Sequence, residues 1–458
     1  MEYEVIVVGG GVGGLTTAAL LAARGVNVCL CERQSQVGGC LADFEHLGYK
    51  FEPTLGLYSG WEAGGTWERI WSELPGAPPT VQKLSPGYVV RLPEARDIAV
   101  SEERDRFEGE LARVFPHFGK PAIEFFRALD RVAESGSDDS VEKLLAQAPA
   151  DFRLFLNVQL QAFGQCTSTQ CSATRAAQLL VPTRVPVWSI DGGGQELANR
   201  LAQSLKASGG TIRLNAPVLR LAYASDGVPV GIDLLSGERV LAKRAIISNL
   251  TVWDTYGKLV GPGRTPKAIA AELRNLHAWG AYLLFLSMDE DAQNRLAARR
   301  MLVAPSGDGE YNAEQQLGIS VSDLSLDRAP EGKRAVTVTT FTEASDWFSF
   351  HEDEASVEEQ DQAALETCWG RLHQAIPELG DSVEVIETVT PRTFYETTRR
   401  KFGMIGAPFN SAGEPVSLES FAVSHFPNLF LMGDTVSPGF GVEGIARKSR
   451  ALADLLTR

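Results

Sequence analysis

The sequence predicts an α/β fold, and three of its features support that prediction. Near the N-terminus, a short apolar run leads at once into a glycine cluster and then into an apolar, helix-forming run. A second apolar run follows and ends in an acidic residue. Close to the C-terminus, another apolar run leads into Gly433-Asp434 and a last helix. Strands that alternate with helices in this way form a parallel sheet with helices on its faces.

The first of these units has the pattern of a nucleotide-binding strand, turn and helix. Residues 5–8 are predicted to form a buried strand, and residues 15–23 a helix. Gly9, Gly11 and Gly14 lie between or at the start of these elements with the spacing G-x-G-x-x-G. In that pattern the three glycines make the tight turn, admit the pyrophosphate and pack helix on strand. Because the N-terminus of the helix then faces the phosphates, the sequence predicts a Rossmann-type dinucleotide-binding domain.

Glu32 ends the second strand, which is predicted over residues 26–31. At this spacing its carboxylate can accept hydrogen bonds from the ribose hydroxyls. The same negative charge repels a 2′-phosphate. The predicted cofactor is therefore FAD or NAD rather than NADP.

Composition and charge restrict the class of protein. The chain has 458 residues, of which 44% are hydrophobic and 22% charged, as in soluble globular proteins of two or three domains. The net charge of −15 argues against a nucleic-acid partner and against electrostatic attachment to anionic lipid. It leaves peripheral membrane contact through an apolar patch open. No apolar run reaches 18 residues, so no membrane span is predicted.

The cysteines and the first residues indicate a cytoplasmic location. Six cysteines show no C-x-x-C pair and have no histidine near them at metal-ligand spacing. Reduced thiols and no metal site are therefore expected. The first strand begins within a few residues of Met1, so we expect no signal peptide.

A second glycine pair extends the N-terminal pattern. After Glu32 come Arg33 and, a few residues later, Gly38-Gly39-Cys40. Residues 5–39 resemble the extended FAD fingerprint of the amine oxidase and phytoene desaturase superfamily, in which such a pair follows the ribose-binding acid. The resemblance implies that the cofactor is FAD, and that Arg33, Gly39 and Cys40 lie beside it.

Further segments resemble the same superfamily and occur in its order. Residues 48–56 look like an aromatic-acid-x-glycine strand that passes near the flavin, with Pro53-Thr54 where a glycine is usual. Residues 216–221 resemble the return of the chain into the FAD domain, which implies that the backbone of Val218 contacts the adenine. Residues 244–249 match the return strand, which ends in Asn249.

The C-terminal segment carries the last part of the resemblance. It implies that Asp434 hydrogen-bonds the ribityl chain. It also implies that the helix N-terminus near Val442 faces the N1–C2=O edge of the flavin, where negative charge accumulates on reduction. The predicted cofactor-binding residues are Gly9, Gly11, Val12, Gly13, Gly14, Glu32, Arg33, Gly39, Cys40, Val218, Asn249, Gly433, Asp434, Gly441 and Val442.

The expected architecture is a Rossmann-type FAD-binding domain with an inserted α+β substrate domain and a helical cap. The FAD-binding domain is predicted to be discontinuous, over residues 1–75, 185–258 and 415–458. The helical cap is predicted over 76–184 and the substrate-binding domain over 259–414. The cap is expected to cover the substrate cavity, with a membrane-dipping face as the alternative.

Within the substrate domain, alternating hydrophobicity predicts half-buried antiparallel strands at 279–286, 317–321 and 334–340. A charge-rich helix is predicted over 357–374, with a solvated face.

A bound flavin in a chain without a metal site or a second dinucleotide motif acts through hydride exchange at N5. The chain most resembles the phytoene desaturase, carotenoid isomerase and retinol saturase branch. The cysteine at position 40 resembles the residue that retinol saturases have there. The motif Gly439-x-Gly441-Val442 resembles the one in the desaturases and isomerases. The resemblance implies a desaturase, saturase or isomerase that acts on carbon–carbon bonds of an isoprenoid, polyene or other apolar lipid. The alternatives are a flavin amine oxidase for a small substrate and a non-catalytic flavin-binding protein.

Glu443 is the first candidate for the catalytic acid or base. It follows Gly441-Val442 in the turn predicted to abut the flavin, where family members commonly carry a proline. Burial in an apolar cavity would favour its protonated form, so that it could exchange a proton with the substrate. The alternative is that Glu443 caps the last helix, whose dipole favours the charged form. Glu52 and Arg392 are the other candidates for the catalytic role.

Overall fold

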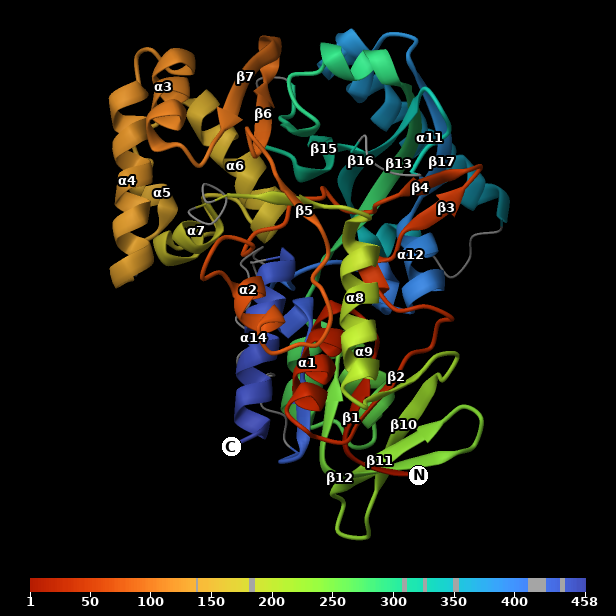
Figure 1. The fold of residues 1–458 in the computed structure, drawn as a ribbon. Coiled ribbons are helices and arrows are strands. Elements are labelled where there is room, and N and C mark those ends of the chain that lie inside the picture. The colour runs from red at the N-terminus through yellow and green to blue at the C-terminus, as the bar shows by residue number, and fades with distance from the viewer. Residues whose placement is uncertain are drawn as a thin grey trace.

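The computed structural model describes residues 1–136, 139–180, 186–306, 311–323, 328–348, 354–410, 426–436 and 441–458. The described strands form two seven-stranded sheets and two short two-stranded ribbons. In Figure 1 the first sheet lies in the lower half, beside both termini, and the second lies above it. The Gly439 of the predicted C-terminal motif lies outside the described residues.

The first sheet carries the predicted nucleotide-binding unit. Its strands, in spatial order, are β10 (Val218–Tyr223), β11 (Pro229–Leu234), β12 (Arg239–Ser248), β1 (Glu2–Val8), β2 (Val28–Cys31) and β9 (Thr211–Arg213), with β18 (Leu429–Leu431) also paired to β12. Strands β9, β2, β1, β12 and β18 are parallel, and β10 and β11 extend the sheet antiparallel. The first part of β12 pairs with β11 and its end pairs with β18. The predicted return strand at residues 244–249 is thus the second half of one longer strand.

Helices cover both faces of this sheet, which explains the unbroken apolar run in β1. Val5 and Val7 belong to one hydrophobic core, and Ile6 and Val8 to the core on the opposite face. One face carries α1 (Val12–Ala23), α2 (Thr66–Trp71), α8 (Gly193–Ala207) and α14 (Gly441–Leu456). The other carries α9 (Val252–Asp254), the π-helical turn η4 (Thr255–Val260) and α10 (Lys267–Arg274).

The second sheet contains the three predicted antiparallel strands, but they are largely buried on both faces and not half-buried as predicted, because cores lie on both sides of the sheet. Its spatial order is β17 (Val383–Val389), β13 (Trp279–Asp289), β16 (Lys333–Glu343), β15 (Leu317–Val321), β14 (Arg300–Val303), β6 (Tyr88–Leu92) and β7 (Arg96–Val100). Only the pair of β14 and β6 is parallel. Leu284 and Leu286 of β13 share a core with Leu372 of α11 (Glu354–Ala375), the predicted charge-rich helix. Leu283 and Phe285 point to the opposite face.

The segment predicted as a helical cap differs from that prediction at its start. Residues 81–100 form strands: β5 (Val81–Lys83) pairs with β8 (Trp188–Ile190), and β6 and β7 extend the second sheet. The physical reason is that β6 is buried on both faces, with Val90 in the core of the cap and Val89 in the core of the sheet. The helices of the cap are α3 (Arg104–Val114), α4 (Gly119–Ser135), α5 (Val141–Leu144), α6 (Ala150–Gly164) and α7 (Ala173–Leu180), drawn in orange and yellow in Figure 1.

Three further elements belong to neither seven-stranded sheet. The single turn η1 (Gly39–Leu41) follows the second glycine pair and leads into the hairpin of β3 (Phe44–His46) and β4 (Tyr49–Phe51). Helix α12 (Pro391–Thr398) begins with a capping box on Thr390. Within the described ranges, none of the helices combines the length and the apolarity that a membrane crossing requires.

Candidate cofactor and substrate site

A cavity of about 670 Å³ lies between the first sheet and the second. Its size is within the range usual for ligand pockets. It is lined by every predicted cofactor-binding residue except Gly14. The predicted residues that line it are Gly9, Gly11, Val12, Gly13, Glu32, Arg33, Gly39, Cys40, Val218, Asn249, Gly433, Asp434, Gly441 and Val442.

The glycine turn forms one wall of the cavity. The space around its glycines is too small for side chains. A Cβ on Gly11 would lie 2.9 Å from Nδ2 of Asn249, and one on Gly13 would lie 2.7 Å from Oδ1 of the same residue. A Cβ on Gly14 would lie 2.2 Å from the carbonyl oxygen of Gly9, so this glycine allows α1 to pack on β1 from behind the cavity. Oδ1 of Asn249 is buried and has no hydrogen-bond partner in the described part of the chain. The wall thus offers backbone N–H groups and one free acceptor to a ligand.

Glu32 ties the end of β2 to this turn. Its Oε2 accepts a hydrogen bond from the N–H of Gly10 at 2.7 Å, and its Oε1 accepts one from the N–H of Gln34 at 2.8 Å. These two bonds fix the orientation of the carboxylate at the cavity wall. Each oxygen keeps a second lone pair with which it can accept a ribose hydroxyl.

Two arginines bring positive charge to the cavity. Arg33 and Arg399 both line it. Burial, and then the charge of Arg399, lower the pKa of Arg33, which means that the two guanidinium groups repel each other. Arg33 donates to the carbonyl oxygens of Glu396 (3.2 Å) and Thr397 (2.5 Å) at the end of α12. Two close cations beside a glycine turn suit the negative charges of a diphosphate.

Asp434 is held by a guanidinium that the sequence did not reveal. Arg400 donates to Oδ1 of Asp434 at 3.2 Å through Nη1 and to Oδ2 at 2.7 Å through Nη2. The N–H of Gly406 donates to the same Oδ2 at 3.1 Å. Burial opposes the charge of Arg400, but Asp434 and other nearby groups raise its pKa overall. Both side chains line the cavity, so the fork also presents its free lone pairs to a ligand.

The part of the cavity that the second sheet bounds is apolar. Leu283 and Phe285 of β13 are 0% and 1% exposed. Phe285 stacks on Phe51 with ring centroids 4.5 Å apart, and Phe44 lies 5.2 Å from it. The residues that form this apolar end are Phe44, Pro53, Leu283, Phe285, Val389 and Phe394. The alternation of β13 explains why Leu283 and Phe285 face the cavity while their neighbours face α11.

Two family models match this chain. The model of flavin-containing amine oxidoreductases matches residues 85–456, and that of NAD(P)-binding Rossmann-like domains matches residues 7–74. The chain belongs to the flavin-containing amine oxidoreductase family. Its cofactor is FAD, as the fingerprint predicted, and it is an FAD-dependent oxidoreductase of the phytoene desaturase type. The glycine wall, the arginine pair and the free Asn249 oxygen fit a bound dinucleotide.

Individual relatives of this flavoenzyme share about a quarter of its residues. The carrot (Daucus carota) prolycopene isomerase is 24% identical, over 99% of this chain and 80% of the isomerase. The all-trans-retinol 13,14-reductase of Danio rerio is 24% identical over 86% of this chain and 75% of the reductase. The 4,4′-diapophytoene desaturase of a Methylomonas species is 24% identical over 99% of this chain and 95% of the desaturase. A solved oxidoreductase of Methanosarcina mazei shares the fold, with a TM-score of 0.70 at 16% identity over 99% and 100% of the two chains.

None of the three predicted catalytic residues of the flavoenzyme lies among the described residues that line the cavity. Glu443 lies in the first turn of α14, where the helix dipole favours a carboxylate. Its Oε1 accepts a hydrogen bond from Thr66 at 2.5 Å, and its Oε2 lies 3.8 Å from Arg447. Glu443 thus faces Thr66 of α2, and its capping of α14 stays a prediction. Its catalytic role stays a prediction.

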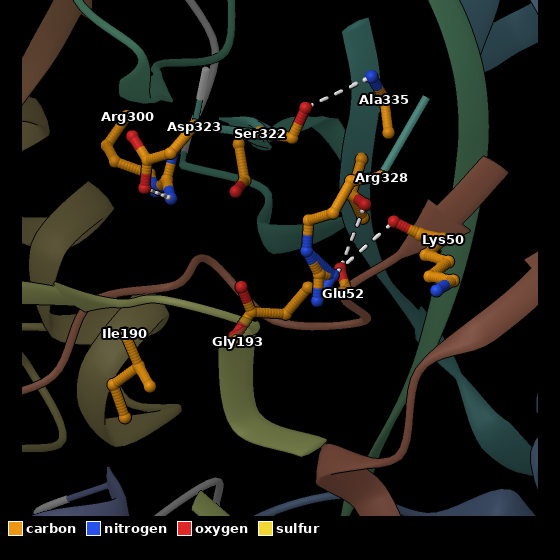
Figure 2. A pocket seen from close by; sticks show the side chains of 11 residues that line it. Lys50, Glu52, Ile190, Gly193, Arg300, Ser322, Asp323, Arg328 and Ala335 are labelled. Carbon is orange, nitrogen blue, oxygen red and sulfur yellow. Dashed lines mark hydrogen bonds and ion pairs between the residues drawn. The ribbon is translucent and has the colours of Figure 1, made fainter. Parts of the chain in front are cut away.

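Arg392 and Glu52 also point away from the cavity. Arg392 donates from Nε to the carbonyl oxygen of Trp347 at 2.5 Å. Glu52 accepts hydrogen bonds from Tyr58, from Thr54 at 3.1 Å and from the N–H of Gly194 at 3.2 Å. Figure 2 shows Glu52 in a separate, small pocket that it shares with Arg300 and Arg328.

Asp43 is the carboxylate at the apolar end, and sequence reasoning missed it. It lies directly between η1 and Phe44 and lines the cavity. Nη2 of Arg328 donates to both of its oxygens at 2.9 Å. Burial nevertheless raises the pKa of Asp43 to about 7, from an ordinary value of 3.8. A usable signal was its place four residues after Gly39, between the two segments expected to lie near the flavin.

The raised pKa of Asp43 predicts a pH dependence of stability. Between about pH 4 and pH 7 the folded state holds a proton that the unfolded state has lost, so the contribution of Asp43 to stability falls as the pH rises through this window. We expect the difference in unfolding free energy between the parent and Asp43→Asn to fall by at most about 4 kcal/mol from pH 4 to pH 7, then to level off. Urea unfolding at several pH values measures it. A difference that stays constant across this range would contradict the raised pKa.

Proposed function

We propose that this flavoenzyme acts on carbon–carbon bonds of an isoprenoid or polyene lipid, as a desaturase, saturase or isomerase. The observation that carries the proposal is the apolar end of the cavity, which adjoins the cofactor wall and is formed by three phenylalanines, a proline and two aliphatic side chains. Such a surface binds a hydrocarbon chain and excludes water from it. The names of the three relatives give the same class of substrate.

The charges at the site favour a neutral substrate over an amine. A substrate ammonium group would need a free carboxylate or an aromatic cage. The described acidic residues that line the cavity already have partners: Asp43 pairs with Arg328, Asp254 with Lys258 and Asp434 with Arg400. Glu32 accepts two backbone N–H groups. Among the described residues at the apolar end, the amine-oxidase alternative therefore has no carboxylate that is not already paired.

For the cofactor, we propose these roles for the residues at the wall. The N–H groups of the glycine turn, with Arg33, hold the diphosphate. Glu32 binds a ribose, the backbone of Val218 meets the adenine, and Asp434 binds the ribityl chain. These roles are supported by the fact that all of these residues line the same cavity. When bound, FAD supplies hydride exchange at N5; the side chains bind and orient the substrate beside it.

We further propose a cytoplasmic protein that meets its substrate at a membrane surface. All six cysteines are free thiols, which is usual in reducing compartments. An apolar lipid partitions into membranes, so the enzyme must collect it there.

Anaerobic mixing of the FAD-loaded protein with polyenes and amines tests the proposed function. We expect bleaching of the flavin band, or a change in the polyene absorption, with at least one of phytoene, a lycopene isomer and retinol in detergent micelles. No change is expected with putrescine or benzylamine, and squalane is the control for the micelles. Rapid flavin reduction by an amine, with no effect of any polyene, would establish the amine-oxidase alternative. No response to any compound would favour the flavin-binding protein without catalysis.

A further inference from the structure

Asp43 differs from the other acidic residues at the cavity by its neighbours. Glu32 is tied to the glycine turn, and Asp434 to Arg400 and the N–H of Gly406. Oδ2 of Asp254 accepts a hydrogen bond from the hydroxyl of Thr251 and another from the backbone N–H of Lys401. Asp43 instead adjoins Phe44, whose ring packs on Phe285 of the second sheet. Asp43 also lines the cavity, so it is the described carboxylate of the cavity wall that directly precedes a residue of the apolar end.

The guanidinium group of Arg328 fixes the position of the Asp43 carboxylate. Arg328 is 6% exposed and uses Nη2 for both oxygens of Asp43. The same guanidinium donates to the carbonyl oxygens of Gly192 (3.2 Å) and Lys50 (3.4 Å), so its position is set by two further segments of the chain. Figure 2 shows Arg328 and Glu52 directed into the same small pocket. Asp43 thus has one defined orientation, with its side chain 11% exposed.

The charges around Asp43 leave both of its protonation states accessible near neutral pH. Burial is the largest influence and raises its pKa, and the carboxylates of Glu52 and Glu45 act in the same direction. Arg328 and Lys50 act in the opposite direction. An acid with a pKa near the working pH can both accept and donate a proton efficiently.

We propose that Asp43 is the catalytic acid or base that exchanges a proton with the substrate carbon next to the one that exchanges hydride. This inference rests on the proposed function. In the oxidative direction, one substrate carbon loses hydride to FAD and its neighbour loses a proton to the Asp43 carboxylate. The electron pair of that second C–H bond becomes the new π bond, so the substrate loses two hydrogens and FAD accepts two electrons. In the reductive direction, protonated Asp43 returns the proton to the carbon.

Asp43→Asn in the full-length, FAD-loaded protein tests the proposal. The amide keeps the size of the side chain and can still accept from Arg328, but it cannot exchange the proton. With a polyene that the parent converts, we expect the rate of flavin reduction or reoxidation to fall by about 100-fold or more. The limb of the pH–rate profile near pH 7 is expected to vanish. The dissociation constants of FAD and of the polyene are expected to change by less than about threefold, since neither depends on proton exchange.

Glu45→Gln is the matched control, because this neighbouring acid is exposed on β3. It is expected to keep the parental rate and to retain the pH limb, moved slightly to lower pH because the charge of Glu45 raises the pKa of Asp43. A rate of Asp43→Asn within about threefold of the parent, or a retained pH limb, would overturn the role of Asp43 while the proposed function stands. If Asp43→Asn loses FAD, Asp43→Glu decides: a shifted pH limb supports the role and an unchanged limb overturns it. A parent that converts no polyene overturns the proposed function itself, and the inference with it.

Discussion

Gly14→Ala is expected to destabilise the protein by at least about 3 kcal/mol and to abolish FAD binding. The added Cβ would lie 2.2 Å from the carbonyl oxygen of Gly9, a backbone atom in the turn that we propose to hold the diphosphate. Either α1 moves off β1 or the turn deforms, and both change the wall of the cavity. An apparent unfolding temperature lower by about 5 °C or more, together with loss of flavin absorbance after gel filtration, is the expected result.

Gly109→Ala is the control for a glycine-to-alanine change in a helix. Gly109 is exposed in the middle of α3, and its added Cβ would meet no atom within 4 Å. Alanine is expected to stabilise this position by about 0.5 to 1 kcal/mol, because it restricts the unfolded chain more than glycine does. If Gly14→Ala kept its FAD and unfolded at the parental temperature, the close packing of α1 on β1 would not be required for the site.

The cofactor half of the site was predictable because its signals are local. Residues 5–14 specify a strand, a turn and a helix within one short segment, and the residues predicted for cofactor binding at the other segments line the same cavity. The positions of β13, β15 and β16 were likewise predicted from local hydrophobicity, although the structure buries these strands on both faces rather than on one. Patterns of this kind need no knowledge of distant contacts.

The substrate half depends on contacts between distant segments. Asp43 acquires its orientation and its raised pKa from Arg328, which is 285 positions away in the chain. Nothing in either local segment predicts that pair. The start of the cap was missed for a related reason: β6 is stabilised by pairing with β14, a strand more than 200 positions later.

The case of Glu443 shows that position in the sequence does not fix the direction of a side chain. Gly441 and Val442 line the cavity, yet the next residue on the helix turns toward Thr66. Successive helical residues project about 100° apart, so an acid one position from a cavity wall can lie outside the cavity.

Arg400→Met is expected to weaken both folding and FAD binding. The change leaves the Asp434 carboxylate, 30% exposed, with the N–H of Gly406 and without its guanidinium. We expect a loss of about 2 to 3 kcal/mol in unfolding free energy of the apoprotein, since an unpaired, largely buried charge is costly. Arg131→Met is the matched control: its pair with Glu124 is 63% and 61% exposed, so its loss is expected to cost less than about 0.5 kcal/mol.

The double variant Arg400→Met/Asp434→Leu separates the structural role of the pair from its role at the cofactor. Replacing both charges by apolar groups removes the unpaired carboxylate, so the unfolding free energy is expected to return to within about 1 kcal/mol of the parent. FAD binding is not expected to return, because the proposed acceptor for the ribityl chain is absent. Urea unfolding of the apoproteins and FAD titration measure the two effects. A double variant that binds FAD as tightly as the parent would show that Asp434 serves the fold alone.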